Sequence, residues 1–129
     1  MSAAFKLDYC RSTDAELINY VRIPRLLIID SAFASLSPEA KLLYALMLDR
    51  VSLSVKNGWV DKHKRVYIYY PIAELMKTMR CQSEKATRLM AELDEPKGFG
   101  LISRVRQGLG KPSRIYVKKL IPTGPCPEP

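Results

Sequence analysis

The stretch from residue 101 to residue 119 constrains the fold more than any other part of this chain. Two short runs of alternating apolar and polar residues, LISRVRQ and SRIYVKK, flank a loop that contains glycine and proline. Alternation with a period of two is typical of half-buried strands, so this stretch predicts a β-hairpin. The face expected to be buried carries Leu101, Val105, Ile115 and Val117. The face expected to be exposed carries Arg104, Arg106, Arg114, Tyr116 and Lys118.

The positive charge of the chain is concentrated in the same stretch. Residues 96–119 contain seven Lys or Arg residues and no Asp or Glu, so they carry +7 of the formal net charge of +8. A concentration of one sign predicts contact with a polyanion such as nucleic acid. The alternative is a basic edge strand whose charges only discourage aggregation.

Two short helices are predicted immediately before the hairpin. Residues 71–79 and 83–94 each place apolar residues at helical spacing, and Ser83 is expected to cap the second helix. Two helices joined by so short a break form a helix-turn-helix, and a hairpin that follows directly gives the order of a winged helix. The expected fold class is therefore α+β and mainly helical: a winged helix-turn-helix with a basic β-hairpin wing and a small additional hairpin.

Two groups of residues are candidates for binding DNA. The second helix of a helix-turn-helix docks through its N-terminal end, which can meet base edges or phosphates. In this chain that end carries Gln82, Ser83, Lys85, Thr87 and Arg88. In the wing, cations and glycines can approach the phosphate backbone or the adjacent minor groove. These wing residues are Arg104, Arg106, Gly108, Gly110, Lys111, Arg114 and Lys118. The alternative for any single helix residue is that it is merely solvated.

The middle of the chain contains one long helix and the additional hairpin. Ser37 before Pro38 predicts the helix start, and Asn57-Gly58 predicts its end. The helix is apolar on more than one face, so it is either central in the domain or shared with a second copy of the molecule, which predicts a homodimer. Residues 59–70 alternate around a polar turn and predict the hairpin. Its tyrosines are expected to pack in the sheet, with stacking on single-stranded bases as the alternative.

No pattern indicates an enzyme, a metal site or a cofactor. His63 is the only histidine, and the three cysteines (Cys10, Cys81 and Cys126) are far apart without a CxxC pair. The loop GLGKP is not a phosphate-binding loop, because that motif requires glycine in place of Val105 and Ser or Thr in place of Pro112. No apolar run reaches 18 residues and the N-terminus does not resemble a secretory signal, so we expect a cytoplasmic protein without a membrane partner.

Three longer motifs carry a family resemblance. They are S-x-x-A-K-L-L-Y from Ser37, K-N-G-W-V-D from Lys56 and R-Q-G-L-G-K-P-x-R-I-Y-V from Arg106. Together they resemble the N-terminal domain of the replication initiator protein A family of Gram-positive plasmids and related mobile elements. The resemblance implies a winged-helix domain that binds repeated duplex sites at a replication origin as a dimer. One departure is Lys64, which stands where the usual pattern of the family has a glycine in the turn.

The sequence thus predicts three regions and one main function. The regions are an N-terminal arm (1–22) with a short helical piece near residues 14–20, a winged-helix DNA-binding domain (23–120) and a proline-rich tail or linker (121–129). The expected function is sequence-specific binding of duplex DNA at a replication origin. Expected partners are double-stranded DNA, a second copy of the chain and host replication proteins. Two alternatives stay open: a transcriptional regulator of the same mobile element, and a protein-interaction module whose wing binds an acidic partner.

Overall fold

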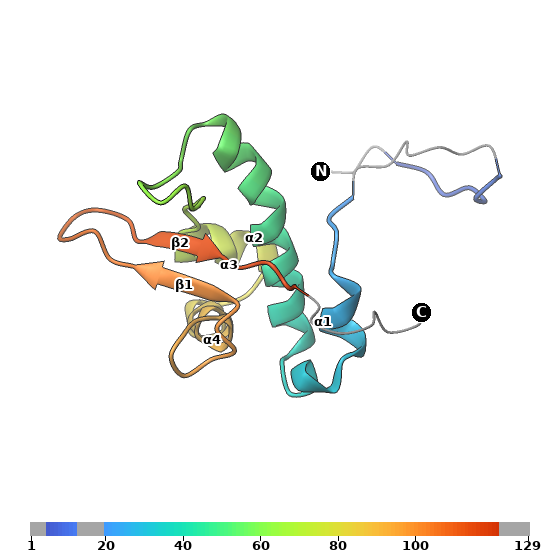
Figure 1. Ribbon diagram of the computed structural model, residues 1–129. Helices are drawn as coiled ribbons and strands as arrows, with labels where there is room; N and C mark the ends of the chain where they lie inside the picture. Colours follow the sequence, from blue (N-terminus) through green and yellow to red (C-terminus); the bar gives the residue numbers. More distant parts are fainter. Residues whose placement is uncertain (1–4, 13–19, 122–129) are drawn as a thin grey trace.

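The computed structural model describes residues 5–12 and 20–121. The helices and strands of these residues are α1 (Arg25–Ile29), the 3-10 helix η1 (Ser31–Phe33), α2 (Pro38–Lys56), α3 (Ile72–Met79), α4 (Ser83–Leu93), β1 (Ile102–Val105) and β2 (Arg114–Val117) (Figure 1). Within the described part of the chain, no helix is long and apolar enough to cross a membrane. Residues 14–19 of the expected short helix and residues 122–129 of the expected tail lie outside the described residues.

Helix α2 begins and ends where the sequence predicts. The Ser37 hydroxyl accepts a hydrogen bond from the Ala40 N–H at 3.2 Å, Pro38 is the first helical residue, and Asn57 is the C-cap. The backbone N–H and the hydroxyl of Ser37 also donate to the Glu92 carboxylate of α4, at 3.0 and 2.9 Å. The start of α2 is therefore fastened to the neighbouring helix as well as capped.

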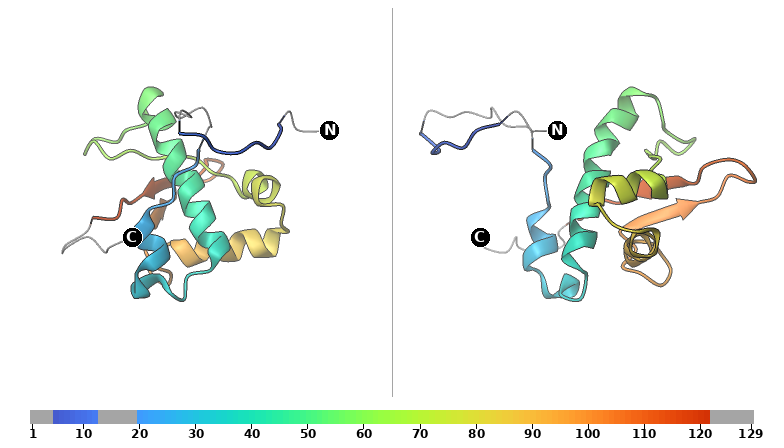
Figure 2. Two further views of the ribbon diagram at one scale, coloured as in Figure 1. Left: turned by 90° about the vertical axis from the view of Figure 1, so that its right-hand side faces the viewer. Right: turned by 180° about the vertical axis from the view of Figure 1, so that it is seen from behind.

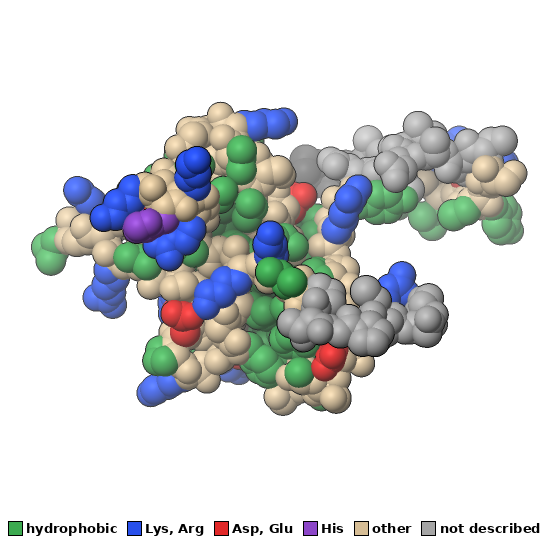
Figure 3. All heavy atoms as spheres, in the orientation of Figure 1, with side chains coloured by type: hydrophobic (Ala, Val, Ile, Leu, Met, Phe, Trp, Pro, Cys, Tyr) green, Lys and Arg blue, Asp and Glu red, His purple; other side chains and the backbone are tan. Residues whose placement is uncertain are grey.

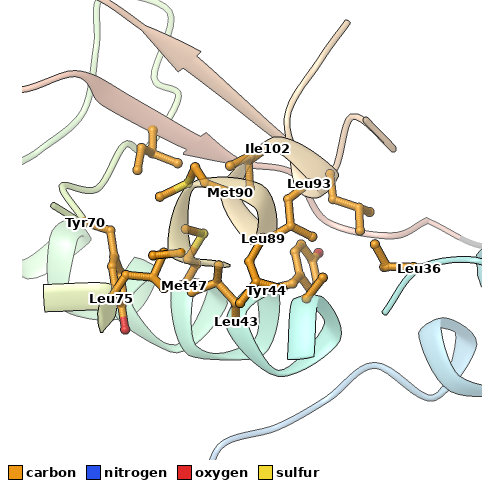
Figure 4. Close-up of a cluster of buried hydrophobic side chains, with 14 of the residues drawn as sticks. Leu36, Leu43, Tyr44, Met47, Tyr70, Leu75, Leu89, Met90, Leu93 and Ile102 are labelled. Atoms are coloured by element: carbon orange, nitrogen blue, oxygen red, sulfur yellow. The ribbon is translucent and has the colours of Figure 1, made fainter. Parts of the chain in front are cut away.

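The core lies between α2, α3, α4 and the hairpin (Figure 4). Tyr44 of α2 is fully buried, and its hydroxyl donates to the backbone carbonyl of Lys118, just after β2. Leu42 and Leu53 of the same helix are about half exposed, so α2 is apolar on more than one face, as expected. The buried side chains of the core labelled in Figure 4 are Leu36, Leu43, Tyr44, Met47, Tyr70, Leu75, Leu89, Met90, Leu93 and Ile102.

Helices α3 and α4 form the predicted helix-turn-helix. Arg80 ends α3 in the left-handed conformation (φ 53°), and the chain turns into α4 at Gln82. The prediction that Ser83 caps α4 is wrong. Gln82 is the N-cap residue, with extended backbone and no side-chain cap, and Ser83 is already helical. The predicted apolar stripe of α4 is buried as expected, and its residues are Ala86, Leu89, Met90 and Leu93.

Strands β1 and β2 form the predicted antiparallel hairpin, with Ile102 opposite Val117 and Val105 opposite Arg114. The predicted faces of β1 are wrong by one residue. Ile102 is fully buried, whereas Val105 is 44% exposed. Because side chains alternate with a period of two, burying Ile102 turns Val105 outward and places Arg104 on the side of the sheet that faces the core. The Arg104 guanidinium reaches the rim of the core and pairs with Asp94 there.

The connection from α4 to β1 requires glycine at one position. A Cβ on Gly98 would lie 2.3 Å from the Ala91 carbonyl oxygen and 2.4 Å from two further carbonyl oxygens at the end of α4. The next N–H, of Phe99, donates to the Glu92 carbonyl at 2.8 Å. The chain therefore folds tightly back over the end of α4, which places β1 beside this helix, where Asp94 and Ile102 form a β-bridge.

The additional hairpin is present in a reduced form. Val60 and Val66 form one antiparallel bridge, and the Tyr67 N–H donates to the Trp59 carbonyl at 3.1 Å. Ile68 then leaves this hairpin and pairs with Ile115 of β2. The segment around Ile68 therefore lies beside β2 on the side away from β1, and both hairpin turns project from the same side of the molecule (Figures 1 and 2).

Candidate nucleic-acid interface

The tip of the wing is an exposed glycine loop between β1 and β2. Gly108 and Gly110 both have positive φ (120° and 76°), and an added Cβ on either would meet nothing within 4 Å. Arg106 and Lys111 flank the two glycines, and both are exposed. Neither forms an ion pair with any described residue, and the wing tip therefore presents two uncompensated cations on open backbone.

The base of the wing is built differently, because its cations have acidic partners. The Nε of Arg104 lies 2.6 Å from a carboxylate oxygen of Asp94, and Lys118 pairs with Glu95. The hydrogen bond from Lys118 lowers the pKa of Glu95, which keeps this carboxylate ionised. Of the predicted wing cations, Arg104 and Lys118 are thus partly neutralised at the junction with α4.

Arg114 differs from the cations of the tip and of the base, because it contacts an aromatic ring and an amide instead of a carboxylate. Its guanidinium lies 4.3 Å from the centre of the Tyr67 ring, and its Nε donates to the Gln107 side chain at 3.1 Å. The amide nitrogen of Gln107 donates in turn to the Pro112 carbonyl at 2.7 Å. This arrangement braces the two arms of the wing against each other below its tip and leaves Arg114 charged without an acidic partner in the described part of the chain.

The N-terminal end of α4 is open to solvent. Gln82, Ser83, Thr87 and Arg88 are exposed. Lys85 is half-buried and pairs with Glu39 of α2 at 3.0 Å, and this hydrogen bond lowers the pKa of Glu39. Lys85 therefore forms a half-exposed ion pair between α4 and α2, and the predicted residues at this end that remain available for a ligand are the other four.

A second basic segment, which the sequence analysis did not assign to the site, lies next to the wing. We call residues 61–65 (Asp61, Lys62, His63, Lys64 and Arg65) the basic loop. It is the turn of the additional hairpin, and Figure 3 shows its histidine among Lys and Arg side chains on the side of the molecule where the wing projects. The signal in the sequence was the run DKHKR, whose position beside the wing depends on the pairing of Ile68 with Ile115.

Aromatic side chains join the basic loop to the wing. The guanidinium of Arg65 lies 5.1 Å from the centre of the Tyr116 ring of β2. Tyr67 and Tyr70 are buried, which confirms that these tyrosines pack within the fold. Tyr69 packs edge-on against Trp59, at a ring-centre distance of 5.1 Å. The basic loop and β2 therefore form one continuous surface.

The chain matches the family model described as "Replication initiator protein A (RepA) N-terminus" over residues 19–125. The chain belongs to this family.

The relatives of this replication initiator domain include one curated protein and several solved structures. The "41 kDa protein" of Lactobacillus helveticus is 32% identical over 110 residues, which cover 81% of this chain but only 30% of that protein. A structure described as "N-Terminal domain of DNA binding protein" is 30% identical, with a TM-score of 0.72 and coverage of 92% of this chain and 88% of that one.

Two further structures resemble the replication initiator domain. One is described as "Structure of Rep-DNA complex", with 33% identity, a TM-score of 0.71 and coverage of 82% of this chain and 79% of that chain. The other is described as "Structure of MDR initiator", with 28% identity, a TM-score of 0.68 and coverage of 81% and 80%. The predicted family and winged-helix fold class are thereby confirmed.

Proposed function

We propose that this replication initiator domain binds duplex DNA in a sequence-specific manner at repeated sites of a plasmid-type replication origin. The observation that carries the proposal is the pair of uncompensated cations at the wing tip, Arg106 and Lys111, on the same domain as an exposed helix start at Gln82. Membership of the family and similarity to a solved Rep–DNA complex support the same ligand.

The two elements suit different parts of a duplex. Helix α4 would enter the major groove with its exposed N-terminal residues, where Arg88 can address guanine or phosphate and Gln82 can address adenine. The wing would follow the phosphate backbone or the adjacent minor groove, because its open glycines let backbone N–H groups approach phosphates. In this arrangement α4 supplies specificity, and the wing supplies affinity for any sequence.

Fluorescence anisotropy at several salt concentrations tests the proposal. The protein is titrated onto labelled fragments of the origin region of its own replicon and onto random duplexes of equal length. We expect one repeat-containing fragment to be preferred, with a preference that persists as salt rises. Equal and salt-sensitive affinity for every fragment would contradict sequence-specific binding, and no binding at low salt would point to a protein-interaction module.

The variant Arg88→Ala separates base recognition from phosphate contact. If Arg88 reads a base pair, its loss relaxes specificity at one position of the site, by about 1–3 kcal/mol of discrimination. Competition with a set of duplexes that carry single base changes measures this effect. An equal loss of affinity for every duplex would instead make Arg88 a phosphate contact.

We further propose that the domain acts as a homodimer through the outer face of α2. Leu42 and Leu53 lie on one stripe of this helix at helical spacing and are 47% and 56% exposed. A second copy of the chain would cover the stripe and bring two α4 helices to two half-sites. Light scattering should give about twice the chain mass of 14.7 kDa. A monomeric mass at the concentrations used for DNA binding would contradict the dimer.

We also propose that this domain itself catalyses no reaction and that it acts in the cytoplasm, where plasmid DNA is replicated. Host replication proteins would then be its partners at the origin. A pull-down with origin DNA present and absent tests this last point: host replication proteins should be retained only when the origin fragment is present.

A further inference from the structure

The basic loop (residues 61–65) lies on the opposite side of the wing from α4. Ile102 of β1 forms a bridge with Asp94 at the end of α4, β2 pairs with β1, and Ile68 pairs with Ile115 on the far side of β2. The order across the surface is therefore α4, β1, β2 and the hairpin that carries the basic loop. A ligand that contacts α4 and the wing reaches the basic loop next, if it continues in the same direction.

The backbone of the basic loop holds a lysine in a conformation that favours glycine. Lys64 has φ 64°, in the left-handed region, where an L side chain crowds its own backbone. Glycine adopts this conformation without that penalty. Outside glycine, the described residues show positive φ only at Lys64 and at Arg80, where it ends a helix. A strained residue of this kind calls for a reason beyond the turn itself.

Asp61 holds the loop in this conformation. One of its carboxylate oxygens accepts from the His63 and Arg65 N–H groups at 2.8 and 2.9 Å, and the other accepts from the Arg65 Nε at 3.1 Å. The Lys64 N–H donates to the Asp61 carbonyl at 2.9 Å. The Asp61 side chain is 8% exposed and compensates the charge of Arg65. The turn is thus closed by one inward carboxylate, and the side chains between its two ends stay on the outside.

The two lysines of the loop, Lys62 and Lys64, have no acidic partner among the described residues. Lys62, His63 and Lys64 are exposed, and neither lysine forms an ion pair within the described part of the chain. The turn that carries them projects from the same side of the molecule as the wing tip, which carries Arg106 and Lys111 (Figure 2). Two lysines held outward beside a basic wing match a line of phosphates better than they match an isolated anion.

We infer that the basic loop is a second backbone-binding element, which contacts the duplex phosphates beyond those reached by the wing through Lys62 and Lys64. This inference rests on the proposed DNA-binding function and extends its footprint. Lys64 is the informative residue, because its left-handed backbone favours glycine and its exposed side chain forms no ion pair with any described residue. The loop contacts phosphates, so it adds affinity for all sequences and no preference among them.

Three substitutions of Lys64 test the inference by fluorescence anisotropy and thermal unfolding. Lys64→Gly and Lys64→Asn remove the charge but suit the left-handed backbone. Each should weaken binding to origin and random duplexes alike, about eightfold at 0.1 M salt, and lower the salt slope by about one. Neither should lower Tm. Lys64→Arg keeps the charge and should bind like the wild type.

Arg25→Asn is the matched control, since it removes one exposed cation from α1, on the other side of α2 from the wing (Figure 1). It should leave affinity and salt slope unchanged. Unchanged binding by Lys64→Gly, while Arg106→Ala weakens it, would overturn the inference and leave the proposed function intact. A weaker affinity that follows a lower Tm would overturn it too, because Lys64 would then be structural. A wild-type protein that binds no duplex would overturn both proposals.

Discussion

The wing tip and the basic loop are neighbouring turns. Both need residues in the left-handed backbone region, but they use different residue types there. Both contain residues in the left-handed region: Gly108 and Gly110 in the wing, and Lys64 in the basic loop. Glycine gives the wing an unstrained turn but contributes no side chain there. Lysine gives the basic loop a cation at the turn, and the hydrogen bonds of Asp61 offset the strain.

The comparison shows two ways to present positive charge to a polyanion. The wing tip has few contacts: an added Cβ on either glycine would meet nothing within 4 Å, and a backbone hydrogen bond from the Lys111 N–H to the Gly108 carbonyl spans the tip at 3.3 Å. The basic loop is already held by three hydrogen bonds to one carboxylate. A turn with few contacts, such as the wing tip, can follow a duplex whose shape varies. A preformed turn, such as the basic loop, loses less conformational entropy on binding.

The largest effect is expected when the wing loses both of its uncompensated cations. The double variant Arg106→Ala/Lys111→Ala should weaken binding to every duplex by about 60-fold at 0.1 M salt and lower the salt slope by about two. Anisotropy titrations over a range of salt concentrations measure both quantities. Arg104→Ala/Lys118→Ala is the control of equal charge, and it should lower the slope less, because these cations already pair with Asp94 and Glu95. Equal slopes for the two double variants would show that the ion pairs open on binding.

A smaller effect, on stability, is expected when the basic loop loses its carboxylate. Burial alone would raise the pKa of Asp61, but hydrogen bonds from Arg65 and His63 outweigh it and lower the pKa to about 2. Asp61→Ala should therefore lower Tm at pH 7. A depressed carboxylate pKa stabilises the fold above the unfolded value of 3.8, and this contribution fades as pH falls toward 2. The Tm difference between wild type and variant should accordingly narrow between pH 4 and pH 2. A difference that is constant over this range would contradict the role of the ionised carboxylate.

The smallest effect is expected for a side chain added to the wing tip. Gly110→Ala places a Cβ at φ 76° in open space, so it costs backbone strain without a clash. Because the tip can rearrange without disturbing the core, the free energy of unfolding should fall by less than about 1 kcal/mol. Urea unfolding with an unchanged m-value measures the loss. A loss of several kcal/mol would mean that the tip packs against the rest of the domain.

The sequence predicts the elements of this domain better than their contacts. Ser37, Pro38 and Asn57 mark the ends of α2 correctly, because capping is a local property of the chain. The prediction of which side chains of β1 face the core is wrong. Leu101 and Ile102 are both apolar, so the alternating pattern fits two registers equally well. The choice between them depends on how the chain folds back over the end of α4 at Gly98, which is a tertiary contact.

Residues of the candidate site could likewise be predicted where they follow a local pattern, but not where they depend on contacts between elements. The wing cations could be found from sequence because they form a single run, and the exposed start of α4 follows from its apolar stripe. The pairing of Lys85 with Glu39 joins residues of α4 and α2, and no periodicity within either helix indicates it. The place of the basic loop beside the wing likewise requires the pairing of Ile68 with Ile115. The short helices α1 and η1, for which no element was predicted, lack a long apolar repeat.

The pairing of Ile68 with Ile115 joins the two hairpins through a reciprocal pair of backbone hydrogen bonds. The Ile68 N–H donates to the Ile115 carbonyl at 2.8 Å, and the Ile115 N–H donates back to the Ile68 carbonyl at 2.9 Å. Neither amide can meet solvent unless both hairpins separate, and both residues are buried. In amide hydrogen exchange these two protons should therefore exchange together and slowly, as reporters of one cooperative opening that frees both hairpins at once.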